Sequence, residues 1–109
     1  MPLRFTTTDP APPGQQEQVL LAARMLMSQI RVSSQELEDL ESGDPHRVAA
    51  AFGRWRRRQH LIARREDALL LELHEAGASD RGLAELMGLN RQTITRRLDR
   101  ARDEREVAR

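Results

Sequence analysis

Apolar residues recur at helical spacing along most of the 109-residue chain, and no stretch shows the strict alternation of a half-buried strand. The first clear stripe begins after Gln15. Its members are Val19, Ala22, Ala23, Leu26 and Ile30, with Leu21 and Met25 beside them. This apolar surface is wider than one core contact needs. It indicates either a well-buried helix or a helix shared between the core and a dimer partner, and the pattern leaves both open.

The next segments are marked by residues that start and stop helices. Ser34 is placed to cap a short acidic helix, QELEDLE, and Gly43 would close it. Asp44 and Pro45 then suit the N-cap and the first position of a further helix. We therefore expect the helical structure to be interrupted before Ser34 and again before Pro45.

Two apolar stripes follow between residues 45 and 76. The first is one helix face with Val48, Phe52, Trp55, Gln59 and Ile62, apolar apart from Gln59, and the second comprises Ala68, Leu69, Leu73 and Ala76. Gly77 would end the second. Because no strong helix breaker lies between the stripes, this region is one long helix or two helices with a kink near Ala63. The chain as a whole is predicted to be all-α.

From Ser79 onward the spacing is more specific. Ser79 would cap a helix with the sequence DRGLAELM, whose inward face is Leu83, Ala84 and Met87. Gly88 follows where a chain leaving a helix adopts a left-handed backbone, which glycine does without steric cost. This stretch therefore predicts a short helix that ends in a tight turn.

A second helix follows the turn. Leu89 is expected to plug the turn with an apolar side chain, and Asn90 would cap the helix RQTITRRLDRAR. The inward face of this helix is Ile94, Leu98 and Ala101. Because Ala84 is small, the two helices can cross closely at a wide angle. A small residue, a glycine four positions later, and apolar residues one, six and ten positions beyond it are typical of a helix-turn-helix unit.

On these residues the chain resembles the helix-turn-helix superfamily of DNA-binding domains, over residues 65–100. It is most similar to the three-helix versions in sigma-factor promoter-reading domains, resolvases and small bacterial regulators. We therefore expect five or six helices, with a C-terminal three-helix helix-turn-helix unit in residues 63–109 on an N-terminal helical platform. That platform, residues 15–62, is also a possible dimerisation region. The proline-rich residues 1–14 are predicted to be a disordered arm.

The resemblance implies that the second helix, residues 91–104, enters the major groove of double-stranded DNA. With Ile94 and Leu98 inside, its opposite face presents Asp99 and four candidate base-reading residues, which are Arg91, Gln92, Thr95 and Arg96. Arg can bond guanine, Gln can bond adenine, and a Thr methyl can contact thymine. The residues that border this face suit phosphate contacts instead, and they are Ser79, Arg81, Asn90, Thr93, Arg97 and Arg100.

The net charge of +1 hides an uneven distribution of charge. Residues 1–45 carry three Arg against seven acids, whereas residues 46–109 carry fifteen Arg against ten acids. Local basic patches, rather than net charge, attract a phosphate backbone. The acidic first part is a possible surface for a protein partner. The acids at positions 66, 67, 72 and 75 are expected to form a charged outer face of their helix.

The RWRRR stretch, Arg54 to Arg58, is the densest basic segment. Trp55 falls on an apolar stripe, so we expect it in the core rather than as a stacking surface for bases. The arginines would grip flanking phosphates or pair with the acidic residues 36–41, of the same subunit or another. Both roles are compatible.

Catalysis finds little support in this sequence. His46, His60 and His74 show no metal-ligand spacing, and no Gly-rich phosphate loop is present. We therefore expect a non-enzyme without metal or cofactor. The longest apolar stretch, residues 19–27, contains Arg24 and falls short of the ~20 residues that span a bilayer. With no cysteine and no signal-peptide pattern at the N-terminus, a cytoplasmic, nucleoid-associated location without membrane contact is predicted.

The sequence thus predicts sequence-specific binding of double-stranded DNA by a bacterial or phage-type transcriptional regulator that acts as a homodimer. The candidate dimer seam is the stripe from Val19 to Ile30. Two alternatives stay open. One is a helical adaptor for protein interactions, and the other is a DNA-binding accessory protein in plasmid or chromosome segregation or in recombination, because the physical act of binding a groove is the same.

Overall fold

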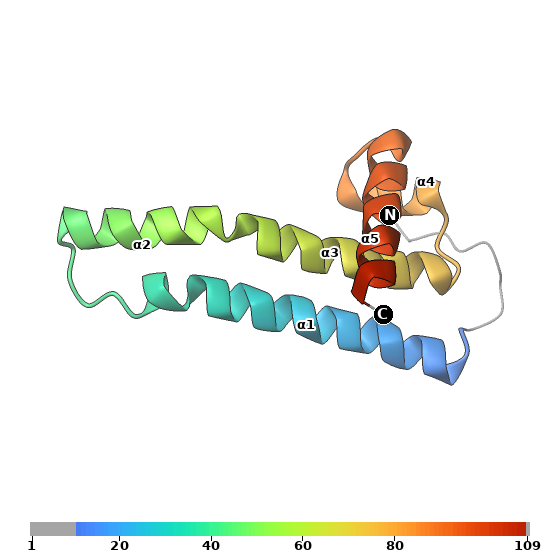
Figure 1. Cartoon of the computed structure of the whole chain (residues 1–109), viewed down its shortest axis with the longest axis horizontal. Helices are drawn as coiled ribbons and strands as arrows, with labels where there is room; N and C mark the ends of the chain where they lie inside the picture. The colour runs from blue at the N-terminus through green and yellow to red at the C-terminus, as the bar shows by residue number, and fades with distance from the viewer. Residues whose placement is uncertain (1–10, 109) are drawn as a thin grey trace.

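A computed structural model describes residues 11–108 and is all-α, with no strand in that range. Its helices are α1 (Pro13–Glu38), α2 (Pro45–Arg57), α3 (Gln59–Glu75), α4 (Asp80–Met87) and α5 (Arg91–Ala108). Helices α2 and α3 form a nearly continuous rod, α1 runs antiparallel beside it, and α4 and α5 lie at the α3 end (Figure 1). Of the predicted disordered arm, residues 1–10 lie outside the described range, whereas Pro13 and Gly14 already belong to α1.

Helix α1 passes through the point where the sequence predicts a new N-cap, so that prediction is wrong. The Ser34 hydroxyl donates to the carbonyl of Ile30 at 2.8 Å, a bond made inside a continuing helix. Its neighbour Ser33 is buried and accepts a hydrogen bond from the Gln29 side chain at 3.0 Å. The packing of this turn therefore outweighs the local preference of Ser34 for a cap. The helix continues to Glu38, with Asp39 as its C-cap.

The start of α2 is as predicted, with Asp44 as N-cap and Pro45 in the first turn. The Asp44 carboxylate accepts from the backbone N–H of His46 at 3.1 Å. The rod breaks at Arg58, not near Ala63, and only this one residue separates α2 from α3. The backbone N–H of Arg58 is shared between the carbonyls of Arg54 and Trp55, which tightens the last turn of α2.

The inward stripe of α1 faces α3 of the same chain. The Gln15 amide at its N-terminal end donates to the carbonyl and the carboxylate of Glu72, at 3.2 and 3.0 Å. The buried Ser33 continues this stripe at the other end. Half-buried residues of the candidate dimer seam lie between them at the same helical spacing, namely Val19, Ala22 and Leu26. These side chains lie between two contacts made within the chain and are therefore not free to form a dimer face.

The hydrophobic core lies among α3, α4 and α5. It comprises Leu70, Leu71, Ala78, Leu83, Ala84, Ile94, Leu98 and Ala101, with Leu73 and Met87 packed against it. The inward faces predicted for residues 79–101 are thus confirmed. By contrast, the stripe predicted around Leu69 is only half-buried, while Leu70 and Leu71 carry the core contact. No helix between residues 11 and 108 combines the length and hydropathy needed to cross a membrane.

Candidate nucleic-acid interface

The turn between α4 and α5 is fixed by backbone hydrogen bonds and one left-handed glycine. Gly88 has φ of 67° and ψ of 31°, which is the left-handed conformation expected at this position. Beside it, the backbone N–H of Leu89 donates to the carbonyl of Ala84 at 3.0 Å. At the other end of α4, the Ser79 hydroxyl accepts from the N–H of Gly82 at 3.0 Å. The predicted cap and the predicted turn glycine are both confirmed.

Helix α5 starts at the predicted cap. The Asn90 side-chain oxygen accepts from the N–H of Thr93 at 2.8 Å, which satisfies one of the N–H groups that a helix N-terminus leaves unpaired. Leu89 does not plug the turn, because it is 36 % exposed. The rigidity of the turn therefore comes from the caps and from Gly88 rather than from an apolar side chain.

Two buried side chains determine which face of α5 is exposed. Ile94 is fully buried and Leu98 is 2 % exposed, so both point into the core. The opposite face lines one open surface hollow with Arg91, Gln92, Thr95, Arg96 and Asp99. We call these five residues the α5 face. The four residues predicted to touch base edges are therefore brought together on one surface.

Most of the α5 face is unoccupied by internal contacts. In residues 11–108, Arg91, Gln92 and Arg96 have no hydrogen-bond or ion-pair partner and are exposed. Thr95 donates to the Asp80 carboxylate at 3.4 Å, a long bond that ties the face to the start of α4. Asp99 pairs with Arg102 at 3.0 Å. Three long polar side chains are thus free to bind a ligand without breaking an existing contact.

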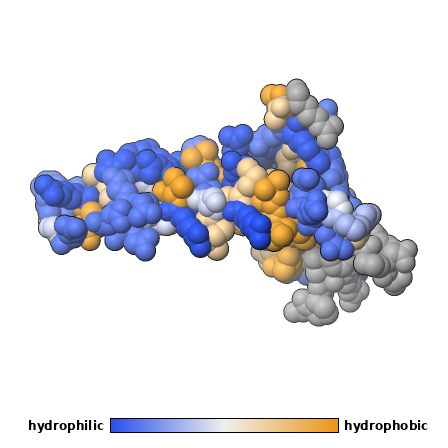
Figure 2. Space-filling model, turned by 90° about the horizontal axis from the view of Figure 1, so that it is seen from below, coloured by the Kyte–Doolittle hydropathy of each residue, from blue (hydrophilic) through white to orange (hydrophobic). Residues whose placement is uncertain are grey.

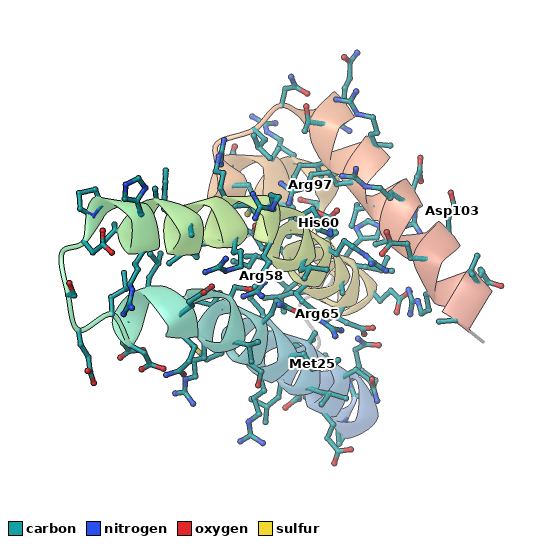
Figure 3. All side chains as sticks on the ribbon, turned by 60° about the vertical axis from the view of Figure 1, so that its left-hand side comes forward. Met25, Arg58, His60, Arg65, Arg97 and Asp103 are labelled. Atoms are coloured by element: carbon teal, nitrogen blue, oxygen red, sulfur yellow. The ribbon has the colours of Figure 1, made fainter. Side chains whose placement is uncertain are left out.

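A buried carboxylate behind α5 is the residue that the sequence pattern missed. Asp67 of α3 was expected on a charged outer face, but its side chain is only 4 % exposed. One carboxylate oxygen accepts from Arg97 Nε and the other accepts from Arg100 Nη2 at 3.2 Å (Arg97 is labelled in Figure 3). Asp67 therefore clamps two arginines of α5 and fixes the rotation of that helix on α3.

The Asp67 contact changes the set of candidate phosphate ligands. The Arg97 side chain is 16 % exposed and held by Asp67, so it is a structural residue and we withdraw it from that set. The Arg100 side chain is 60 % exposed and keeps free N–H donors beyond its bond to Asp67. The Arg81 side chain is 69 % exposed and only loosely paired with Glu85, at 3.6 Å. Ser79, Asn90 and Thr93 stay at the helix starts that border the α5 face.

A second ion pair holds the C-terminal half of α5. Arg105 donates through both terminal nitrogens to the Glu75 carboxylate, one at 3.1 Å, and lies 3.6 Å from Glu72. The hydrogen bonds from Arg105 lower the pKa of Glu75 below its ordinary value of 4.5, against a smaller opposing effect of burial. Glu72 and Glu75 therefore face α5, and the predicted outer acidic face is wrong for them as it is for Asp67.

We expect a Glu75→Gln variant to be slightly less stable than the wild type at pH 7. Because the folded-state pKa of Glu75 is depressed, the stabilisation is complete above pH 4.5 and is lost as the pH falls through the lowered value. The Glu75 side chain is 37 % exposed, so screening limits the effect to less than about 1 kcal/mol. Urea unfolding at pH 7 and at pH 3 measures it. A difference that grows toward pH 3 would contradict the assignment.

The RWRRR stretch lies where α2 ends, in a helix that contacts neither α4 nor α5, so we do not count its arginines among the candidate phosphate contacts. Arg54 pairs with Glu36 of α1, its Nε lying 2.7 and 2.8 Å from the two carboxylate oxygens, and this pair lowers the pKa of Glu36. The predicted pairing with the acidic segment thus occurs within one subunit for Arg54. Trp55 is half-buried rather than fully inside, and its ring stacks on that of Phe52 at 6.0 Å.

The histidines take ordinary roles. His74 contacts the carbonyl of Ala78 at 3.0 Å and the Asp80 carboxylate at 3.3 Å, and His60 contacts the carbonyl of Arg57 at 2.8 Å. Among residues 11–108, no three or more His, Cys, Asp or Glu side chains gather as metal ligands would.

No family model, curated protein or solved structure matches this chain. The chemistry of the α5 face and of the residues that support it is therefore the basis for a function.

Proposed function

We propose that the chain binds double-stranded DNA by placing α5 in the major groove. The observation that carries this proposal is the α5 face itself, where Arg91, Gln92 and Arg96 are exposed together and unpaired within the described residues. A helix with its side chains is about 10–12 Å in diameter, close to the ~12 Å width of the major groove of B-DNA. The geometry of α4, Gly88 and α5 supports a helix-turn-helix arrangement for this docking.

The residue types on this face match what base edges offer. The Arg guanidinium can donate two parallel hydrogen bonds to O6 and N7 of guanine. The Gln amide can both donate to and accept from adenine, and the Thr95 methyl can contact the methyl of thymine. We therefore assign base contacts to Arg91, Gln92, Thr95 and Arg96. The Asp99 carboxylate is expected to repel negatively charged groups such as phosphates from its part of the face.

Phosphate contacts fall to the residues around this face. Arg81 and Arg100 supply positive charge on its border, with side chains 69 % and 60 % exposed. The start of α5 is a further candidate, because the N–H groups of a helix N-terminus attract phosphate. Ser79, Asn90 and Thr93 belong to the two helix starts. This distribution positions the protein on the backbone while the α5 face touches the bases.

In cellular terms, we propose a bacterial or phage-type transcriptional regulator, associated with the nucleoid and acting as a homodimer. A single recognition helix covers only part of a turn of groove, whereas two copies reach half-sites about 34 Å apart. Roles in segregation or recombination would use the same contacts. The alternative of an adaptor docked through the acidic first part is weakened by Arg54, which already pairs with Glu36 of that segment.

The affinity for duplex DNA is expected to fall steeply with salt. Each phosphate neutralised contributes about −0.9 to the slope of log affinity against log salt, so Arg81 and Arg100 alone give about −2 for each copy bound. Fluorescence anisotropy of a labelled random duplex, titrated with the full chain from 50 to 300 mM salt, measures this slope. An Arg81→Ala, Arg100→Ala variant should flatten the slope. A wild-type slope near zero would contradict DNA binding.

A further inference from the structure

The half of the molecule away from the core is poorly buried. We call α1 and α2 together the arm, which is distinct from the disordered arm predicted for residues 1–14. The hydrophobic core contains no residue of either helix. In α1 the only buried residue is Ser33, and in α2 it is Ala51. Helix α1 contacts α2 and α3 along a single stripe, which buries little apolar surface, so the arm lacks the core that normally stabilises such helices.

The arm also exposes an unusual number of large apolar side chains. On α1 they are Leu20 (51 % exposed), Leu21 (51 %), Met25 (38 %), Met27 (49 %), Ile30 (38 %) and Val32 (65 %), and on α2 Phe52 is 53 % exposed. Figure 2 looks at the α1 side of the molecule and shows hydrophobic patches among hydrophilic surface along this helix. Exposed apolar surface that exceeds single scattered side chains is a mark of interaction surfaces in soluble proteins.

These side chains fall on two flanks of α1. Leu20, Ala23, Met27 and Ile30 recur at i, i+3, i+7 and i+10, which is one side of a helix. The other flank holds Leu21, Met25 and Val32, and Val32 borders a surface hollow shared with Glu36, Asp39, Arg54 and Arg58. The second flank is therefore interrupted by charge beside Val32, whereas the first has charged residues only along its outer edge, at Arg24 and Arg31, and at its end, at Glu38.

The ion pair between Glu36 and Arg54 shows that Phe52 lies on the same side of the molecule as the first flank. At about 100° per residue, Ile30 lies about 120° around α1 from Glu36, and Phe52 lies about 160° around α2 from Arg54. Since Glu36 and Arg54 meet on one side of the antiparallel pair, Ile30 and Phe52 lie on the other. We name this side the apolar flank, made of Leu20, Ala23, Met27, Ile30 and Phe52.

We propose that the apolar flank binds the same flank of a second copy of this chain. Helix α1 is about 39 Å long for its 26 residues and α2 about 20 Å long for its 13, so at about 10 Å wide each the two helices present a face on the order of 600 Å². Two such faces bury about 1,200 Å² in total, which is the lower end of the range for specific, stable interfaces. Two arms packed in this way form a four-helix bundle, which supplies the core that a single arm lacks.

A second copy fits this surface better than an unrelated partner. A twofold interface needs one patch that is complementary to itself, and the stripe of Leu, Ala, Met and Ile on α1 meets its own copy with Glu38 and Arg56 at its rim. The inference rests on the proposed function in one respect only, since two copies would carry two α5 faces to neighbouring half-sites. Its structural argument comes from the arm alone.

The test is analytical ultracentrifugation of the full chain without DNA. The wild type should sediment as a dimer at micromolar concentration. The variant Met27→Asp, Ile30→Asp should raise the dimer dissociation constant at least about 100-fold, because it would bury unpaired carboxylates at the seam. Val32→Asp, on the opposite flank, is the matched control and should stay dimeric. Helical circular dichroism checks that each variant is folded.

A milder pair of variants guards against loss of folding. The chain has no natural cysteine, so Met27→Cys and Val32→Cys each carry a single thiol. Alkylation of the thiol at position 27 should slow at least about tenfold as protein concentration rises and the flank is covered, while the thiol at position 32 should react at a constant rate. A wild type that stays monomeric at 100 µM, or a folded aspartate variant that remains dimeric, would overturn the proposal.

DNA binding is scored separately in these samples. A monomeric Met27→Asp, Ile30→Asp variant that still binds random duplex in a salt-dependent way supports both the flank and the proposed function. A wild-type dimer that binds no DNA would support the dimer interface on the apolar flank and contradict the proposed DNA binding. A wild-type monomer that binds DNA would contradict the dimer interface and support the proposed DNA binding.

Discussion

Replacing Asp67 by asparagine is expected to lower the free energy of unfolding by roughly 3 kcal/mol. The Asp67 side chain is 4 % exposed and its two oxygens accept from Arg97 and Arg100. Removing its charge leaves the Arg97 guanidinium, 16 % exposed, without a counter-ion, and an uncompensated buried charge is far more costly than a lost surface pair. Because Arg97 can turn partly toward water, the loss falls at the lower end of the range for buried pairs.

Two comparisons separate this effect from a general loss of charge. Asp103→Asn, on the exposed side of α5 (Figure 3), removes the same charge and should change stability by less than about 0.5 kcal/mol. A double variant, Asp67→Leu with Arg97→Met, should regain most of the lost stability, since apolar residues of similar volume often replace a buried pair without cost. Urea unfolding followed by circular dichroism measures all of them. An Asp67→Asn variant as stable as Asp103→Asn would show that the clamp contributes nothing.

The parts of the site that depend on neighbouring residues were predictable from sequence. Ser79 and Asn90 cap their helices and Gly88 takes the left-handed turn, because each of these preferences is set within about one helical turn of backbone. The burial of Ile94 and Leu98 follows from the 3.6-residue period in the same way. Once those two residues are inside, the exposed face of α5 is fixed by geometry.

Features that depend on distant packing were not predictable. Asp67 sits among acids at spacings typical of a solvated face, and its partners Arg97 and Arg100 lie 30 and 33 residues later. Only the docking of α5 on α3 brings them together. Ser34 shows the same limit, since its preference for a cap was outweighed by the packing of the turn that contains Ser33.

The apolar pattern of α1 has a related ambiguity. Helical spacing identified a wide apolar surface, but it could not say which stripe meets another helix of the same chain. The structure assigns the stripe of Val19, Ala22 and Leu26 to α3, and leaves Leu20 and Met27 exposed beside it. The helical period of apolar residues shows that one face of a helix is apolar, whereas the tertiary structure shows what covers that face.

Substitution of the unpaired α5 residues is expected to remove sequence-specific DNA binding without unfolding the protein. In the triple variant Arg91→Ala, Gln92→Ala, Arg96→Ala, each lost base contact costs about 1–3 kcal/mol, so affinity for a preferred duplex should fall at least about 100-fold. The three side chains are exposed and make no internal contact within residues 11–108. Stability should therefore change by less than about 0.5 kcal/mol for each substitution.

A matched control tests whether charge alone explains such a loss. Arg56→Ala with Arg57→Ala removes two positive charges, as many as the triple variant does, but from exposed positions on α2. If α5 reads base edges, this control should bind the preferred duplex within about threefold of the wild type, because distant exposed charges are screened over about 10 Å at 0.1 M salt. An equal loss in both variants would indicate non-specific attraction only.

The most direct measurement is selection of bound duplexes from a random-sequence DNA pool by the wild type, the triple variant and the α2 control. The wild type and the control should enrich one shared sequence motif, and the triple variant, folded by circular dichroism, should enrich none. A motif that appears equally with the triple variant, or a wild type that enriches no motif, would contradict the proposal that the α5 face reads DNA.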